Sequence, residues 1–110
     1  MIAEIKLTKT MLEKHIIDAN KSVRELVKPM GVDYEAMKAG DKQELDAIYS
    51  DGTVTKVNFY RTKNARADRR ISIKGIKAHA DIGDVVVLSC IDDSKEKILI
   101  TINEYEDWIR

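Results

Sequence analysis

The sequence predicts a mainly β protein with one or two short helices, arranged as an open β-barrel. Three observations support this fold class. Short β-prone segments recur at hairpin spacing, Asp51-Gly52 joins two of them as a tight turn, and one or two small helices are inserted between the first and second segments. A chain of 110 residues has room for one domain with its own core, so we assign residues 1–110 to a single domain.

The first part of the chain combines a strand with short helical pieces. Residues 3–7 alternate apolar and polar side chains, which is typical of a half-buried strand. Residues 8–15 form a loop or a short helical turn. Ser22 and Glu25 have the spacing of a capping box, so we expect a helix over residues 22–28 that begins there and ends at the following proline.

From residue 44 onward the pattern is that of strands. Before it, Asp33 is expected to cap one more brief helical turn. The apolar residues of 53–60 alternate imperfectly, which suggests a bulge, and the polar residues 62–68 suggest a loop. A turn or single helical turn is expected at 75–80, a turn at 92–94, and an acidic helix docked by Trp108 at 103–110. The predicted strands are 44–49, 53–60, 69–74, 85–91 and 97–102, with 85–91 in a central position because it is continuously apolar.

Basic residues gather in one segment of the chain. The whole chain has 19 basic and 19 acidic residues and therefore no net charge. Residues 56–77 contain eight of the basic residues and one acid, Asp68, so this segment carries +7 and the remaining 88 residues carry −7. A molecule polarised in this way presents one face that attracts polyanions such as nucleic acids. A solvated strand face is the alternative interpretation of the same charges.

Residues 66–70 carry side chains suited to reading a G·C base pair. A guanidinium can donate two hydrogen bonds to O6 and N7 of guanine, and a carboxylate can accept one from N4 of cytosine. Arg66, Asp68 and Arg70 are expected to share one face of an extended segment, about 6–7 Å apart, while Arg69 points elsewhere. A surface ladder of ion pairs is the alternative. The lone carboxylate favours readout, or a role in holding an arginine rotamer, because a purely electrostatic patch has no use for it.

A second candidate surface lies near the N-terminus. Asn20 can pair with N6 and N7 of adenine, and the neighbouring lysines can contact phosphates, whereas a lone histidine such as His15 is more often a surface or structural residue. The phosphate contacts that we expect to set affinity and its salt dependence come from Lys9, Lys14, Lys63, Lys74 and Lys77.

Two further residues have structural interpretations. Tyr60 is expected to pack in the core, with stacking on a sugar or base as the alternative. Cys90 is the one cysteine of the chain and lies in an apolar run, so we expect a buried, inert thiol. The sequence offers neither a disulfide within the chain nor a metal site, and we expect no cofactor.

The residues from Tyr60 to Ile71, with Arg66-x-Asp68-Arg69-Arg70 at their centre and Ile-Ser-Ile-Lys-Gly after them, resemble the N-terminal effector-DNA-binding domain of the EcoRII restriction endonuclease. That domain and the plant B3 transcription-factor domains belong to one group of DNA-binding pseudobarrels. Leu7-Thr8-Lys9, Lys14-His15 and Asn20 are similar to its first DNA-contacting arm, and Gly83-Asp84 before an apolar strand is similar to the Gly-Asp start of a B3 barrel strand.

The resemblance implies two arms that enter the major groove of duplex DNA from either side of the barrel. This chain departs from the family in having Asp68 where glutamate is usual, and its first arm is less rich in glycine. Both departures bear on which base sequence is recognised. The base readers that the resemblance implies are Arg66, Asp68, Arg69, Arg70 and Asn64 in the C-terminal arm, and His15 and Asn20 in the N-terminal arm.

The sequence therefore predicts sequence-specific binding of double-stranded DNA by a non-catalytic domain, the recognition domain of a restriction or related DNA-processing enzyme. Glu4-Ile5-Lys6 and Asp93-Ser94-Lys95 match the metal-binding pair of restriction nucleases only formally, so we expect any nuclease activity on further domains of the same enzyme. The alternative is a protein-interaction barrel of the transition-state-regulator or adaptor type. No membrane segment or export signal is visible, which predicts a cytoplasmic protein.

Overall fold

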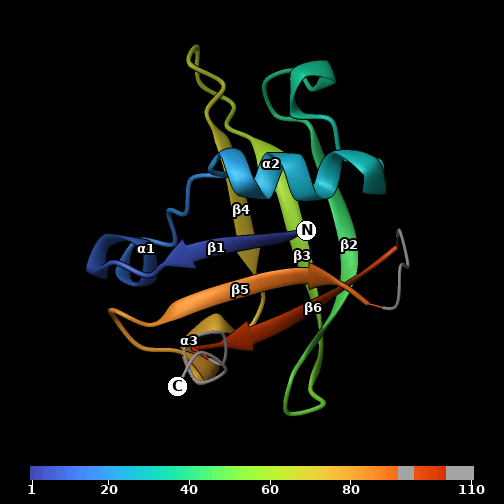
Figure 1. Cartoon of the computed structure of the whole chain (residues 1–110). Coiled ribbons are helices and arrows are strands. Elements are labelled where there is room, and N and C mark those ends of the chain that lie inside the picture. The colour runs from blue at the N-terminus through green and yellow to red at the C-terminus, as the bar shows by residue number, and fades with distance from the viewer. Residues whose placement is uncertain (92–95, 104–110) are drawn as a thin grey trace.

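A computed structural model describes residues 1–91 and 96–103 of the chain (Figure 1). Two of its short helical segments, η1 and η2, are 3-10 helices. The elements in chain order are β1 Ile2–Lys6, α1 Lys9–Glu13, α2 Lys21–Val27, η1 Lys28–Met30, η2 Tyr34–Ala36, β2 Lys42–Tyr49, β3 Val54–Arg61, β4 Arg69–Ile73, α3 Ile76–His79, β5 Val85–Cys90 and β6 Lys97–Ile102.

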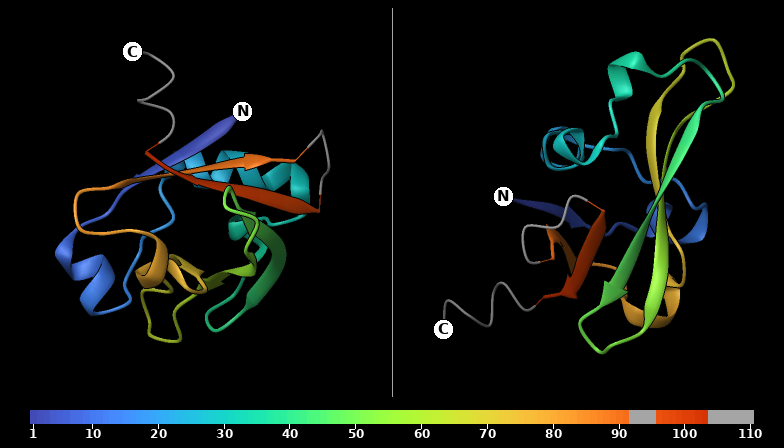
Figure 2. Two further views of the ribbon diagram at one scale, coloured as in Figure 1. Left: turned by 90° about the horizontal axis from the view of Figure 1, so that it is seen from below. Right: turned by 90° about the vertical axis from the view of Figure 1, so that its right-hand side faces the viewer.

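The six strands form one curled sheet in the order β1-β5-β6-β2-β3-β4. Neighbouring strands are antiparallel except β2 and β6, which run parallel. Figure 2 shows the sheet curling so that β1, β5 and β6 form one side and β2, β3 and β4 the other. Helix α2 crosses the upper part of β2, β3 and β4 (Figure 1). The predicted mainly β, open-barrel fold is confirmed.

Strand β3 shows how alternation builds the core. Val57 and Phe59 are fully buried, whereas Val54 is 78% exposed on the other face. The ladder between β2 and β3 runs without interruption, so the expected bulge is wrong. Thr55 also points inward, although it is polar. Its buried hydroxyl donates to the carbonyl of Lys74 at 2.8 Å. This hydrogen bond satisfies the polar group, and no backbone irregularity is needed.

Strands β4 and β5 follow their predicted patterns. Ile71 and Ile73 of β4 point into the core, as expected from their alternation with polar residues. Strand β5 lies between β1 and β6, and its Val86 and Leu88 are fully buried, so its interior position is confirmed. Cys90 at its end is half-buried rather than fully buried, with Sγ 3.6 Å from Sδ of Met30.

The chain itself covers the outer edge of β4. After α1, a short extended segment runs beside this strand: the amide of Ala19 donates to the carbonyl of Arg69 at 3.0 Å, and the amide of Ile71 donates to the carbonyl of Ile17 at 2.9 Å. Ile17 and Ala19 are buried there. Because β1 lies at one end of the strand order and β4 at the other, this segment links the two edges of the open barrel.

The N-terminus of α2 differs from its prediction. The N-cap is Asn20, whose Oδ1 accepts from the amide of Val23 at 3.0 Å, and the expected capping box at Ser22 is wrong. The hydroxyl of Ser22 instead donates to the same Asn20 oxygen at 2.7 Å. An asparagine two residues earlier reaches the free amides of the first turn, so the helix begins before the serine. The expected cap at Asp33 is confirmed, since its Oδ1 accepts from the amide of Glu35 at 3.0 Å.

The predicted turn at 92–94 lies outside the described residues, and so does the predicted tail helix beyond residue 103. Within residues 1–91 and 96–103, no helix is long and apolar enough to cross a membrane. No group of three His, Cys, Asp or Glu side chains in these same ranges is arranged to hold a metal ion.

Two valines on opposite faces of β3 provide a matched test of the core. We expect Val57→Ala to lower the free energy of unfolding by about 1–3 kcal/mol, because two buried methyl groups are lost and a cavity remains. Val54→Ala makes the same chemical change at an exposed site of the same strand and is expected to stay within about 0.5 kcal/mol of the wild type. Urea unfolding measures both, and equal losses would contradict the inward placement of Val57.

Candidate nucleic-acid interface

The loop between β3 and β4, residues 62–68, is held by its own hydrogen bonds. The amide of Thr62 donates to the carbonyl of Asp68 at 3.0 Å, and the amide of Asp68 donates to the Thr62 hydroxyl at 2.8 Å. Inside this closure, Oδ1 of Asn64 accepts from the amides of Arg66 and Ala67, each at 3.1 Å. The loop is therefore preorganised, with Ala67 in the left-handed region at φ 47° and Arg66 exposed near the tip.

Asp68 lies between two of the predicted readers. Its Oδ1 is 3.4 Å from Nε of Arg66, and its Oδ2 accepts from Nη2 of Arg70 at 3.1 Å. The Asp68 and Arg70 side chains are only 20% and 18% exposed, whereas that of Arg66 is 82% exposed. The three side chains come together through ion pairs, the alternative that the sequence left open, and the carboxylate orients both guanidinium groups. Their role in base readout stays a prediction.

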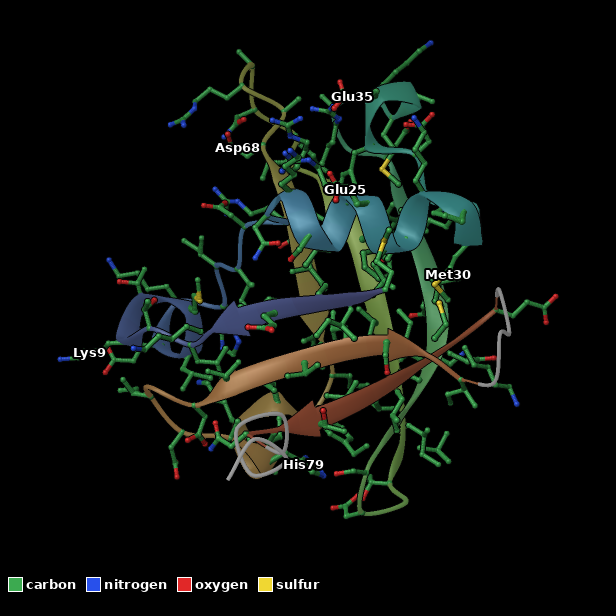
Figure 3. All side chains as sticks on the ribbon, viewed as in Figure 1. Lys9, Glu25, Met30, Glu35, Asp68 and His79 are labelled. Atoms are coloured by element: carbon green, nitrogen blue, oxygen red, sulfur yellow. The ribbon has the colours of Figure 1, made fainter. Side chains whose placement is uncertain are left out.

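Arg69 pairs with a different acid, although it lines the same pocket as Arg66, Asp68 and Arg70. Its Nη1 donates to Oε1 of Glu35 at 2.8 Å. Figure 3 shows Glu35 and Asp68 at the same end of the molecule, with nitrogen-bearing side chains between them. Arg69 and Arg70 therefore pair with different acids, although they are neighbours in the sequence.

Arg61 is a residue of this region that sequence reasoning passed over. Its Nε donates to the carbonyl of Tyr34 and its Nη1 to the carbonyl of Ala67, both at 2.8 Å, and its side chain is only 15% exposed. It thereby joins the end of β3 to η2 and to the loop between β3 and β4. The alternation of the strand could have revealed the inward position of Arg61. Val57 and Phe59 point inward, so the side chain of Arg61, two residues further on, also points toward the interior.

These side chains surround a pocket of about 470 Å³, which we call the arginine pocket. Three acids also line it, Asp18, Glu35 and Asp68, so its charged side chains sum to +2. Asp18 comes from the segment that covers the β4 edge, and its Oδ1 lies 2.9 Å from Nε of Arg70. The arginines of the pocket are Arg24, Arg61, Arg66, Arg69 and Arg70.

The five arginines are held in two ways. Arg24 and Arg61 donate to backbone carbonyls, Arg24 to that of Ala19, and so connect elements of the fold. Within the described part of the chain, the other three are held through carboxylates. A carboxylate can be exchanged for a phosphate or a base edge far more easily than a carbonyl of the main chain.

The predicted N-terminal arm lies on the same side of the barrel as the loop, at a different height along β4 (Figures 1 and 2). His15 follows α1 and is exposed, with a left-handed backbone at φ 56°. Lys9 is exposed and 3.9 Å from Glu13, and Lys14 is exposed at the end of α1. Asn20 already uses its amide: besides capping α2, its Nδ2 donates to the carbonyl of Glu4 at 2.9 Å. Reading a base with Asn20 would cost the helix this cap, about 1 kcal/mol.

The other predicted phosphate contacts and Tyr60 lie on the outer face of the sheet or beyond its strands. Tyr60 is half-buried opposite Lys42 and Arg70 in the sheet register, so its expected core position is wrong. Successive residues of a strand alternate faces, and Phe59 occupies the inward position beside it. Lys63 and Tyr60 line a second pocket of about 470 Å³ on this face. The lysines at 74 and 77 are exposed, after β4 and on α3.

His79 has structural partners within the fold. Its ring stacks on that of Tyr49 with 3.6 Å between centroids, Nδ1 lies 3.0 Å from the carbonyl of Gly75, and Nε2 lies 3.3 Å from Oδ2 of Asp51. Hydrogen bonds from Thr53 and the nearby His79 lower the pKa of the Asp51 carboxyl. These contacts fasten α3 to the hairpin between β2 and β3, at the end of the sheet opposite the arginine pocket (Figure 3).

Comparison with known proteins gives a likeness to solved structures. No protein-family model matches the chain, and no curated protein matches it. Among solved structures, the chain is similar to the N-terminal domain of Helicobacter pylori LlaJI.R1, with a TM-score of 0.54 and 16% sequence identity. The match covers 100% of this chain and 99% of that one. At this identity the likeness shows a shared fold over the full length of both chains.

The buried hydroxyl of Tyr34 connects η2 to the arginine pocket. It also makes the stability of the folded protein sensitive to high pH. The hydroxyl donates to the carbonyl of Arg70 at 2.7 Å, and burial raises the pKa of Tyr34 well above its ordinary value near 10. The unfolded chain loses this proton at lower pH than the folded chain. The contribution of the neutral hydroxyl is therefore complete below pH 10 and is lost as the pH rises above it.

We expect Tyr34→Phe to cost about 1–3 kcal/mol of unfolding free energy at neutral pH, because a buried carbonyl loses its donor. The variant should also lose less further stability than the wild type between pH 9 and 11.5. Urea unfolding across this pH range measures both effects. Tyr49→Phe is a second case, for which we expect effects in the same direction. The hydroxyl of Tyr49 donates to the carbonyl of Lys74 at 2.9 Å, and burial raises its pKa to about 12. Equal pH profiles for wild type and Tyr34→Phe would contradict the assignment.

Proposed function

We propose that this chain binds double-stranded DNA in a sequence-specific manner through the major groove, as the recognition domain of a restriction or related DNA-processing enzyme. The observation that carries the proposal is the geometry of the loop between β3 and β4, residues 62–68, which we call the reading loop. Asn64 and Thr62 hold its backbone, and Asp68 positions Arg66 near its tip and Arg70 in the strand that follows. A preorganised guanidinium loses little freedom on binding, so its hydrogen bonds can contribute to discrimination between bases.

The electrostatics of the chain support the same proposal. The segment from 56 to 77 carries +7 and includes the whole reading loop and the strand after it. Lys63 lies in this loop, with Lys74 and Lys77 farther along the same segment, and all three are exposed. We assign them, together with Lys9 and Lys14, to phosphate contacts, which position a protein on the duplex without reading its sequence.

The structural neighbour adds independent support of a coarse kind. LlaJI.R1 is a restriction-related protein, and its N-terminal domain shares the fold of this chain over the full length of both. The predicted place of the chain within the EcoRII and B3 group rests on the sequence resemblance and remains part of the proposal. A protein-interaction barrel is the outcome that the following experiment would favour if DNA binding fails.

The roles of individual residues give distinct expectations for DNA binding. Arg66→Ala and Arg70→Ala are each expected to remove sequence preference at a cost of about 1–3 kcal/mol for the preferred duplex, with a smaller loss on random duplex. Lys74→Ala should weaken both duplexes alike and reduce the slope of affinity against salt by about one phosphate contact. Lys97→Ala is the control, because this exposed lysine on β6 lies outside the basic segment.

The measurement is selection from a randomised duplex library by gel shift at about 100–150 mM salt, followed by titration of each variant on selected and random duplexes. Arg66 is exposed, so its variant tests readout without disturbing the fold, whereas thermal unfolding must accompany Arg70→Ala. Enrichment of a short motif that Arg66→Ala no longer prefers would support the assignment. Equal losses on both duplexes for all three variants would contradict it, and no enrichment with the wild type would contradict specific binding.

A further inference from the structure

Two acidic side chains from the N-terminal half of the chain form ion pairs with arginines of the pocket. Oε1 of Glu35 lies 2.8 Å from Arg69, and Oε2 lies 3.8 Å from Arg61. Oδ1 of Asp18 lies 2.9 Å from Nε of Arg70. Glu35 and Asp18, which we call the acidic pair, are 69% and 75% exposed, whereas the three arginines are between 15% and 40% exposed. The carboxylates therefore lie on the solvent side of the guanidinium groups.

The position of the acidic pair makes it a competitor for any incoming anion. A phosphate oxygen accepts from the same guanidinium nitrogens as a carboxylate oxygen does. Exposed ion pairs are weak and screened by salt, so both acids can be displaced. An anion that enters the pocket must displace them or bind beside them, and in either case it meets their negative charge.

Asp68 differs from the acidic pair. It belongs to the reading loop, is only 20% exposed, and holds two arginines at once. It therefore remains with Arg66 and Arg70 when the outer acids leave. Arg70 also has an unused donor: although Nε lies near Asp18, it is buried and makes no aligned hydrogen bond to any described residue. A ligand that replaces Asp18 with a well-directed acceptor would satisfy this donor.

We propose that Glu35 and Asp18 set the specificity of DNA binding by competing with phosphates for the arginines of the pocket. This inference rests on the proposed function. Random duplex offers these arginines only phosphates. A phosphate that binds there replaces the carboxylate of Glu35 or Asp18 as the partner of the arginine. A preferred site instead offers neutral base edges to Arg70 and the reading loop, and the negative charge of the acidic pair repels a neutral acceptor far less than it repels a phosphate. The acidic pair thus lowers affinity for random DNA more than affinity for the preferred site.

The test compares Glu35→Gln, Asp18→Asn and the double variant with the wild type on random duplex, on the selected duplex and on inorganic tripolyphosphate. At about 50 mM salt we expect each single substitution to strengthen binding of random duplex about two- to five-fold, and the double variant to strengthen it further. The selected duplex should gain less, so the ratio of the two affinities falls. The gains should shrink as salt rises.

Glu44→Gln is the matched control. Glu44 lies on β2, is 55% exposed and is 3.4 Å from Lys56 on β3. Its substitution therefore removes the same charge from an ion-paired glutamate that lies outside the arginine pocket. Equal gains in Glu44→Gln would reduce the effect to net charge and overturn the proposal. Unchanged or weaker binding of random duplex in both single variants would also overturn it.

The tripolyphosphate titration separates this inference from the proposed function. If no variant binds either duplex, DNA binding fails, and the small polyanion still reports on the pocket. Stronger tripolyphosphate binding by Glu35→Gln and Asp18→Asn, but not by Glu44→Gln, would then support competition by the acidic pair. If duplex binds and removal of the acids changes neither ligand, the inference fails while the proposed function stands.

Discussion

The pairing of residues 17–19 with the edge of β4 is the constraint on which much of this structure depends. Two backbone hydrogen bonds, between Ala19 and Arg69 and between Ile71 and Ile17, satisfy groups that a free edge would leave open. The same pairing carries the chain from β1 to the opposite edge of the sheet and delivers Asn20 to the start of α2. It also places Asp18 beside Arg70, so one short backbone contact joins the barrel to the arginine pocket.

The arginines of the pocket differ in the partners that hold them. Arg61, with donors on two carbonyls, and Tyr34, with its hydroxyl on the carbonyl of Arg70, hold η2, the loop and β4 together. Arg24 donates to the carbonyl of Ala19, whereas Arg66, Arg69 and Arg70 are held by carboxylates, which are exchangeable partners. A main-chain carbonyl cannot leave without unfolding its element, whereas an exposed carboxylate needs only a rotamer change. The arginines that hold the fold and those that we propose to contact DNA thus differ in their partners.

The strands and the reading loop were predictable because their signals are local. Ile71 and Ile73 alternate with polar residues, Asp51-Gly52 is a turn pair, and residues 62–68 lack apolar side chains that could form a strand. The errors came where two local signals competed. Ser22 and Asn20 are both good N-caps, and only the position of the β4 edge segment selects Asn20. At β3, Val54 suggested an inward position, yet it is Thr55 that finds a carbonyl acceptor inside the barrel.

The sequence by itself determined the mainly β fold class, the order of the elements, the basic segment and the grouping of Arg66, Asp68 and Arg70. These features follow from period-two alternation, turn chemistry and short sequence separations, which act within a few residues. Only the tertiary structure decided that Glu35 pairs with Arg69 and Asp18 with Arg70. Their sequence separations are 34 and 52 residues, and the pairs are exposed and weak, so no local pattern encodes them. They form because the curled sheet and the β4 edge segment bring the N-terminal acids to the basic loop.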